Sequence, residues 1–405
     1  MPFVERTLEM VVRRAAREFP AVVVTGPRQS GKTTLTKHLF AGKLSYASLE
    51  PPNVRAAAES DPVAFLDMYP PPVVFDEVQH APSLLPYIKE RIDSRRNRPG
   101  QYILTGSQNL QLAQGVTESL AGRAAVLKLL PMTSREICRQ PRRPLPWERQ
   151  GIPRSESASS TRQAWDRFLR GFYPEPALSP RRDSTLWHAG YVQTYLERDV
   201  RSVRQVGDLS QFQAFLRLLA ARSAQLLDLT GLSRDLGVAL NTVKAWLSVL
   251  EATHQVFILR PYFSNTAKRL VKTPKVYFMD VGTLCYLSGL GDPQHAMAGP
   301  MGGAIFETVV VGEVYKALCH RGQEPRISFW RTSTGIEVDL VVEHGQRLIP
   351  IEIKLSATPQ PAMTRGIEAF RRDHSASVGR GIVVHSGRAF LPLGSDTVAW
   401  PFAAL

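Results

Sequence analysis

The chain has 405 residues, of which 43% are hydrophobic and 21% charged, so its composition excludes wholesale disorder. At roughly 100–200 residues per domain, this length predicts two to four domains. The 50 Lys and Arg residues outnumber the 36 Asp and Glu residues, and the net charge of +14 favours a polyanionic partner, nucleic acid before an anionic membrane.

Cysteine spacing and the lack of long apolar runs indicate the cellular compartment of the protein. Cys138, Cys285 and Cys319 are far apart and form no CxxC pair, which argues against a disulfide scaffold and a cysteine-based zinc site. Residues 1–19 carry charged side chains instead of the apolar run of a signal peptide, and no stretch approaches the ~18 apolar residues of a membrane span. We therefore expect a cytoplasmic protein with no membrane partner.

A phosphate-binding pattern follows the first apolar run. Residues 21–25 are rich in β-branched side chains and predict a buried strand, whereas Leu35 and Leu39 predict one face of a helix. Between them lies a complete GxxxxGK[ST] sequence, in which backbone N–H groups and the helix N-terminus converge on phosphate oxygens. We expect Lys32 to contact the β- and γ-phosphates of ATP and Thr33 to ligate Mg²⁺. The predicted nucleotide-binding residues are Gly26, Pro27, Arg28, Gln29, Ser30, Gly31, Lys32, Thr33 and Thr34.

The next two apolar runs end in polar residues suited to the same site. Residues 72–77 end in adjacent carboxylates, where Asp76 would hold Mg²⁺ through water and Glu77 would polarise the attacking water. Residues 101–108 predict a third strand, whose final residues, Thr105, Ser107 or Gln108, would sense the γ-phosphate.

Arg123 precedes a fourth predicted strand, residues 124–130. Its guanidinium group would neutralise charge in the transition state, either in the same chain or in a neighbouring subunit. A solvated surface arginine is the alternative interpretation. We expect a homo-oligomer, but the sequence does not say which arginine acts between subunits.

These motifs resemble the Walker A, Walker B and sensor-one elements of an AAA+-type P-loop ATPase. Residues 194–200 and 268–271 are also similar to segments of a widespread bacterial and archaeal family, in which such an ATPase is fused to a C-terminal domain. The resemblance implies an α/β fold with a doubly wound parallel sheet in residues 1–138 and catalysis by Lys32, Asp76, Glu77 and Arg123.

Residues 139–205 predict a linker rich in proline and arginine, followed by helix. Within residues 139–182, ten arginines face four acidic residues. Such a segment is either a basic loop that follows phosphates without reading sequence or a solvated insertion. A helix is predicted for residues 191–203, and Arg198, Arg201 and Arg204 on one side are a second group that would contact nucleotide or an adjacent subunit.

Residues 206–282 predict a winged helix-turn-helix. A helix over residues 230–236 would end at Gly237, and a second would begin near Asn241. Asn241, Thr242 and Lys244 would then face DNA, with a β-wing formed by apolar segments near residues 256–259 and 275–278. This module would either contact DNA or serve as a protein scaffold, and the sequence favours the two roles equally.

Residues 283–405 predict a second α/β domain. Asp339 lies on one predicted strand and Glu352 and Lys354 on one face of the next, while Glu307 comes from the preceding helix. The set resembles the PD-(D/E)xK core of restriction-endonuclease-like domains, which implies a second Mg²⁺ or Mn²⁺ site, although Val338 stands where that pattern has proline. An ion pair in a degenerate nuclease fold is the alternative.

Together these motifs predict a Mg²⁺-dependent ATPase coupled to DNA binding and DNA cleavage. The alternative is an ATP-dependent assembly switch, whose C-terminal domain is a catalytically dead nuclease fold used for partner binding.

Overall fold

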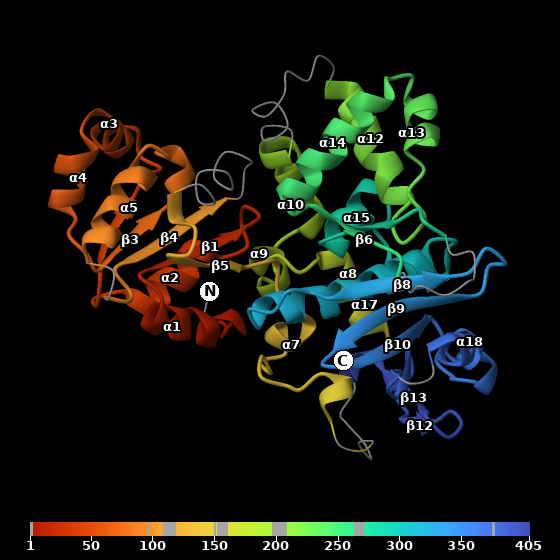
Figure 1. Ribbon diagram of the computed structural model, residues 1–405. Coiled ribbons are helices and arrows are strands. Elements are labelled where there is room, and N and C mark those ends of the chain that lie inside the picture. The colour runs from red at the N-terminus through yellow and green to blue at the C-terminus, as the bar shows by residue number, and fades with distance from the viewer. Residues whose placement is uncertain are drawn as a thin grey trace.

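The computed structural model describes residues 3–95, 98–107, 119–149, 151, 161–196, 209–262, 271–374 and 377–405 (Figure 1). Gln108, Arg198, Arg201, Arg204 and residues 268–270 of the family-like segment lie outside the described residues. Among the described residues, no helix is both long and apolar enough to cross a membrane.

The N-terminal unit alternates strands and helices around one sheet. Its elements are α1 (Leu8–Glu18), β1 (Ala21–Gly26), α2 (Lys32–Phe40), β2 (Ser45–Ser48), α3 (Pro52–Ser60), α4 (Pro62–Met68), β3 (Val73–Asp76), η1 (Val78–His80), α5 (Leu84–Ser94), β4 (Tyr102–Ser107) and β5 (Ala124–Lys128). The five strands are parallel in the order β2-β3-β4-β1-β5. The sequence did not predict β2, because this short strand is polar and only Ala47 in it is buried.

Helices cover both faces of this sheet, as the predicted doubly wound fold requires. Successive residues of β1 alternate between the faces: Val22 and Val24 pack with α1 and α2, whereas Ala21 and Val23 join the core beneath α4 and α5. Because β4 lies between β1 and β3, the carboxyl ends of all three strands meet at one edge of the sheet.

The central region is mainly helical. It comprises α7 (Ser134–Ile137), η2 (Pro146–Glu148), α8 (Thr161–Arg170), α9 (Pro174–Leu178), α10 (Ser184–Tyr191), a π-helical turn η3 (Val192–Leu196), α12 (Leu209–Ala221), α13 (Leu229–Leu236), α14 (Leu240–Ala252), β6 (Val256–Leu259) and β7 (Lys275–Phe278). The helix predicted from residue 191 is thus a continuation of α10 as far as Leu196, and the residues after it lie outside the described part.

The two helices expected of a helix-turn-helix are present. α13 ends at Gly237, whose φ of 63° is the left-handed cap that the sequence predicted, and α14 begins three residues later. Trp246 of α14 packs against Phe212 and Phe215 of α12.

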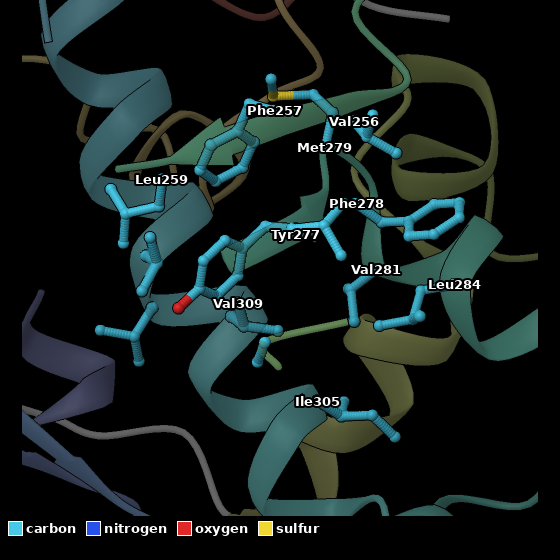
Figure 2. Packing of buried hydrophobic residues seen from close by; sticks show 14 of the residues in the cluster. Val256, Phe257, Leu259, Tyr277, Phe278, Met279, Val281, Leu284, Ile305 and Val309 are labelled. Carbon is cyan, nitrogen blue, oxygen red and sulfur yellow. The ribbon is translucent and has the colours of Figure 1, made fainter. Parts of the chain in front are cut away.

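The two strands expected to form a wing pair antiparallel, but they do not project into solvent. All of β7 and most of β6 are buried. Figure 2 shows Phe257 and Tyr277 of this ribbon packed in one core with Ile305 and Val309, which belong to the following long helix. That helix covers aromatic side chains on both strands, and the role of the ribbon as a wing stays a prediction.

The C-terminal region contains α15 (Val281–Leu287), α16 (Pro293–Ala298), α17 (Gly302–His320), β8 (Ile327–Arg331), β9 (Glu337–His344), β10 (Arg347–Lys354), η4 (Pro361–Thr364), α18 (Arg365–His374), β11 (Gly381–His385), β12 (Leu391–Pro392), β13 (Thr397–Pro401) and η5 (Phe402–Ala404). Its six strands follow the order β12-β13-β11-β10-β9-β8, with β8, β9 and β10 antiparallel and β10, β11 and β13 parallel.

One hydrophobic core runs without interruption from Leu130 through α8 to α17 and the C-terminal sheet. No separate cores therefore mark the predicted boundaries at residues 139, 206 and 283 among the described residues, and those boundaries stay predictions.

A buried ionic network joins the N-terminal unit to α17, one end of which lies beside it (Figure 1). The Arg6 guanidinium donates to the carbonyl oxygens of Ser30 (2.9 Å) and Leu130 (2.7 Å), and its Nε lies 3.2 Å from Glu136 Oε2. His320 accepts the Leu130 N–H at Nε2 (3.1 Å), so its proton lies on Nδ1, 3.3 Å from Glu136 Oε1.

Glu136 is the centre of this network and is fully buried. Burial alone would raise the pKa of its carboxyl group, but the charge of Arg6 and the contacts with His320 and Thr133 hold that pKa well below the ordinary value. The ionised carboxylate is therefore part of the folded structure.

We expect Glu136→Gln to lower the free energy of unfolding by about 3–5 kcal/mol, because the Arg6 guanidinium would remain buried without its counter-ion. Urea unfolding followed by circular dichroism measures the loss. Asp67→Asn is the matched control, since Asp67 pairs with Arg91 at the surface and its loss should cost about 0–1 kcal/mol. Equal losses in the two variants would contradict a structural role for the network.

Candidate functional site

The loop between β1 and α2 has the backbone of a phosphate cradle. A Cβ atom on Gly26 would lie 2.1 Å from the carbonyl oxygen of Leu129, so only glycine allows β1 and the chain after β5 to approach this closely. Gly31, with φ of 95°, turns the chain into α2. Lys32 is buried, and its ammonium group donates to the carbonyl oxygens of Gly26 (3.1 Å) and Pro27 (2.9 Å). The cation thus stands inside the loop.

Asp76 lies at the carboxyl end of β3 and faces this loop. Its Oδ2 accepts the hydroxyls of Thr33 (2.8 Å) and Tyr46 (2.7 Å), and its Oδ1 accepts the hydroxyl of Thr105. A threonine hydroxyl beside an aspartate carboxylate is a donor set of hard oxygens that suits Mg²⁺. Thr33 and Asp76 therefore fit the predicted metal role.

Glu77 has a left-handed backbone, with φ of 59°, which directs it away from the strand. Its Oε2 accepts from the Ser107 N–H (3.3 Å) and hydroxyl (3.4 Å) and contacts Gln79. Burial raises the pKa of this carboxyl group, but the charge of Lys32 and the hydrogen bond from Gln79 outweigh it, and the net pKa is lowered. Glu77 is thus an ionised acceptor at neutral pH, as a residue that orients water must be.

Three of the remaining predicted residues lie beside the phosphate loop or Glu77, whereas Arg123 lies at the opposite edge of the sheet. Ser107 contacts the Glu77 carboxylate, whereas Arg28 is half-buried and Thr34 is exposed in the first turn of α2. Arg123 lies before β5, at the edge of the sheet opposite the phosphate loop, about 17 Å away along five strand residues. There it forms two hydrogen bonds with Asp93 (2.6 and 2.9 Å). This position excludes action on the nucleotide of its own chain, and a role between subunits stays a prediction.

Three residues that the sequence did not single out also belong to this region. Tyr46 comes from β2 and binds Asp76, and Arg6 holds the Ser30 carbonyl oxygen of the loop. His254, which follows α14, is buried, and its pKa is lowered to about 3 by that burial and by the charges of Lys128 and Lys32. Only the fold brings these residues to the loop, because none lies in a recognisable motif.

The C-terminal acidic residues also converge. Glu307, Asp339, Glu352 and Lys354 line one cavity of about 650 Å³. Lys354 Nζ lies 2.6 Å from Glu352 Oε2 and 3.1 Å from Asp339 Oδ2, and Asp339 Oδ2 also accepts the Ile353 N–H (2.7 Å).

Lys275 enters the same cavity from β7 and changes its chemistry. Its ammonium group lies 2.8 Å from Glu307 Oε1 and also pairs with Glu337. Among the described residues, no three Asp, Glu, His or Cys side chains form a group that could hold a metal ion. A divalent cation would therefore have to displace Lys275 or Lys354.

Crowded carboxylates in this cavity hold protons more tightly than usual. Burial and the charge of Asp339 raise the pKa of Glu352 to about 8, despite Lys354. The same two causes raise the pKa of Glu307 to about 7, despite Lys275. A cation that binds here must release these protons.

The predicted DNA-contacting residues lie in the first turns of α14. Asn241 and Lys244 are exposed and Thr242 is half-exposed. They form an accessible polar surface, separate from the buried β6–β7 ribbon.

Three families match consecutive parts of the chain. One described as an AAA domain matches residues 18–138, a domain of unknown function (DUF8612) matches residues 161–294, and another (DUF4143) matches residues 302–405. The uncharacterized proteins Rv2008c of Mycobacterium tuberculosis and Mb2031c of Mycobacterium bovis are each 30% identical over 394 residues, which is 96% of this chain and 82% of theirs.

Two solved structures are similar at a lower level. The Walker-type ATPase PABY2304 of Pyrococcus abyssi has a TM-score of 0.43 and 14% identity, covering 69% of this chain and 94% of that one. RuvB of Thermotoga maritima, solved as a single-residue variant, has a TM-score of 0.27 and 16% identity, covering 62% of this chain and 87% of that one.

The nuclease interpretation requires Mn²⁺ to bind at the C-terminal cavity, and such binding should tighten as pH rises from 6 to 8.5, by roughly tenfold per pH unit for each proton released below its pKa. Isothermal titration calorimetry measures the affinity. Glu352→Gln should abolish binding, whereas Glu343→Gln, which changes an exposed acid of the same sheet, should not. Binding independent of pH, or retained in Glu352→Gln, would contradict this assignment.

Proposed function

Because this chain belongs to the same family as the mycobacterial proteins Rv2008c and Mb2031c and carries an AAA domain over residues 18–138, we propose that it couples Mg²⁺-dependent ATP hydrolysis to DNA binding. The convergence of Lys32, Thr33, Asp76 and Glu77 at one sheet edge carries the first half of this proposal. The second half is supported by the basic composition and the exposed first turns of α14.

Each side chain has a distinct part in hydrolysis. Lys32 exchanges two backbone carbonyl oxygens for phosphate oxygens when nucleotide enters the loop. Thr33 and Asp76 would hold Mg²⁺, which neutralises phosphate charge. The Glu77 carboxylate orients a water molecule for in-line attack, while Ser107 and Gln79 fix that carboxylate from the side.

We expect Glu77→Gln to lower kcat for ATP hydrolysis by roughly 10²–10⁴-fold with little change in ATP affinity, because the amide keeps the shape of the side chain but loses its charge. Phosphate release gives kcat, and a fluorescent ATP analogue gives the affinity. Lys32→Ala should instead lose binding. Hydrolysis at the wild-type rate in both variants would refute the ATPase assignment.

We expect duplex DNA to stimulate ATP hydrolysis in a salt-dependent manner, and Lys244→Glu to lose both DNA binding and stimulation. Fluorescence anisotropy of a labelled duplex reports binding. Lys272→Glu, an equal change of charge at an exposed lysine outside α13 and α14, is the matched control. Turnover unaffected by DNA, together with oligomer size that depends on nucleotide, would favour the assembly switch instead.

The C-terminal cavity supports a second candidate function, metal-dependent cleavage of DNA. The observation that favours it is the convergence of Glu307, Asp339, Glu352 and Lys354, which come from one helix and two strands. The same series of Mn²⁺ concentrations, applied to the protein with plasmid DNA, measures cleavage as a function of Mn²⁺ occupancy. Cutting that follows Mn²⁺ occupancy and disappears in Glu352→Gln supports this function, whereas no cutting at saturating Mn²⁺ leaves the ion-paired cluster as a surface for partners.

A further inference from the structure

A cavity of about 1070 Å³ lies beside α7. Its walls come from Glu5, from α7 and the residues after it, from α8, from Glu313 of α17 and from the C-terminal residues Phe402, Ala403 and Leu405. Six arginines line it: Arg135, Arg139, Arg142, Arg143, Arg149 and Arg167. Neither the ATPase residues nor the C-terminal acidic residues contribute to this wall, so it is a separate site.

The cavity has a strong excess of positive charge. Its two acidic side chains already have cationic partners, since Glu5 binds Arg142 (2.8 Å) and Glu313 binds Lys316 (2.9 Å). Among the side chains of the wall, six guanidinium groups against two carboxylates leave a formal excess of four positive charges.

Burial and repulsion between neighbouring guanidinium groups lower the pKa values of two of these arginines. Burial, with the charges of Arg321 and Arg143, lowers the pKa of Arg135 to about 10 despite the nearby Glu313. Burial and the charge of Arg149 lower the pKa of Arg143 as well. Cations crowded in this way are stabilised by a multivalent anion.

Local contacts hold two of the guanidinium groups in place. Arg135 donates to the carbonyl oxygen of Arg143 (2.7 Å), and Arg143 donates to that of Ala403 (3.2 Å). Arg139 lies just after α7 with φ of 58°, a conformation that usually favours glycine. The Arg135 and Arg143 guanidinium groups are therefore held in place before an anion binds, which lowers the entropic cost of binding.

The volume of the cavity and the arginines that line it indicate which class of ligand it would bind. Segments from five distant parts of the sequence line it, and its volume lies just above the usual range of small-molecule sites, about 300–1,000 Å³. Guanidinium groups bind phosphate oxygens through paired hydrogen bonds. We propose that this cavity binds the polyphosphate chain of a small ligand with three or more phosphate groups, either a nucleoside triphosphate or inorganic tripolyphosphate.

The proposal is tested in the Lys32→Ala full-length chain, so that binding in the phosphate loop does not contribute. Calorimetric titration with tripolyphosphate and with ATP, both without Mg²⁺, should reveal one site that weakens as salt rises. The double variant Arg139→Glu/Arg142→Glu should lower affinity by at least about tenfold. Arg162→Glu/Arg181→Glu changes the same charge at exposed arginines outside the cavity and should have no effect.

Cys138 supplies a reporter inside the cavity, because it lines the wall and is exposed, whereas Cys285 and Cys319 are buried. Bound tripolyphosphate should slow alkylation of Cys138 by N-ethylmaleimide, as mass spectrometry would show. Equal protection by ATP and tripolyphosphate identifies the phosphate chain alone as the ligand, and stronger protection by ATP identifies a nucleotide. Binding without protection, or protection only by a single-stranded oligonucleotide, would overturn the proposal.

Discussion

The carboxylate of Glu136 is the constraint on which the arrangement of this molecule depends. It is fully buried and ionised, and it is held by Arg6, by His320 and by the backbone N–H groups of Thr7 (2.8 Å) and Thr133 (2.9 Å). A charge this deep persists only where it is both paired with opposite charge and hydrogen-bonded. The N-terminal segment, the phosphate loop, α7 and α17 must therefore keep their relative positions for the carboxylate to stay satisfied.

The arrangement of side chains in the nucleotide site depends on the strand order of the N-terminal sheet. With β4 between β1 and β3, Thr105 is placed to bond Asp76 and the Glu77 N–H at once. Ser107, two residues further on, reaches the Glu77 carboxylate. Asp76 and Glu77, the proposed metal-binding and water-orienting residues, are thus held by a strand that contributes no part of the phosphate loop itself.

The sequence alone was enough to predict those functional residues whose chemistry requires a fixed spacing along the chain. The phosphate loop, the adjacent acids at the end of β3 and Glu352 with Lys354 on one strand face follow from local patterns. Lys275 could not be found in this way, because it lies 32 residues from its partner Glu307 and on a strand expected to form a wing. The basic composition after residue 139 was visible in the sequence, but contacts as distant as that between Arg143 and Ala403 were needed to show that it lines a cavity.

The helix α17 determines how the chain can be divided experimentally. It spans 19 residues, about 28 Å, with Glu307 near its first turn and His320 at its last. On one face, Glu313 accepts the Ser134 N–H (2.8 Å) and Lys316 donates to the Met132 carbonyl oxygen (2.9 Å). A fragment that stops at the end of the AAA match, residue 138, would leave Glu136 and the chain around α7 uncovered. The N-terminal unit is thus completed by a helix encoded some 170 residues later, so a fragment cut at the end of the family match would lack the partners that α17 gives to its buried groups.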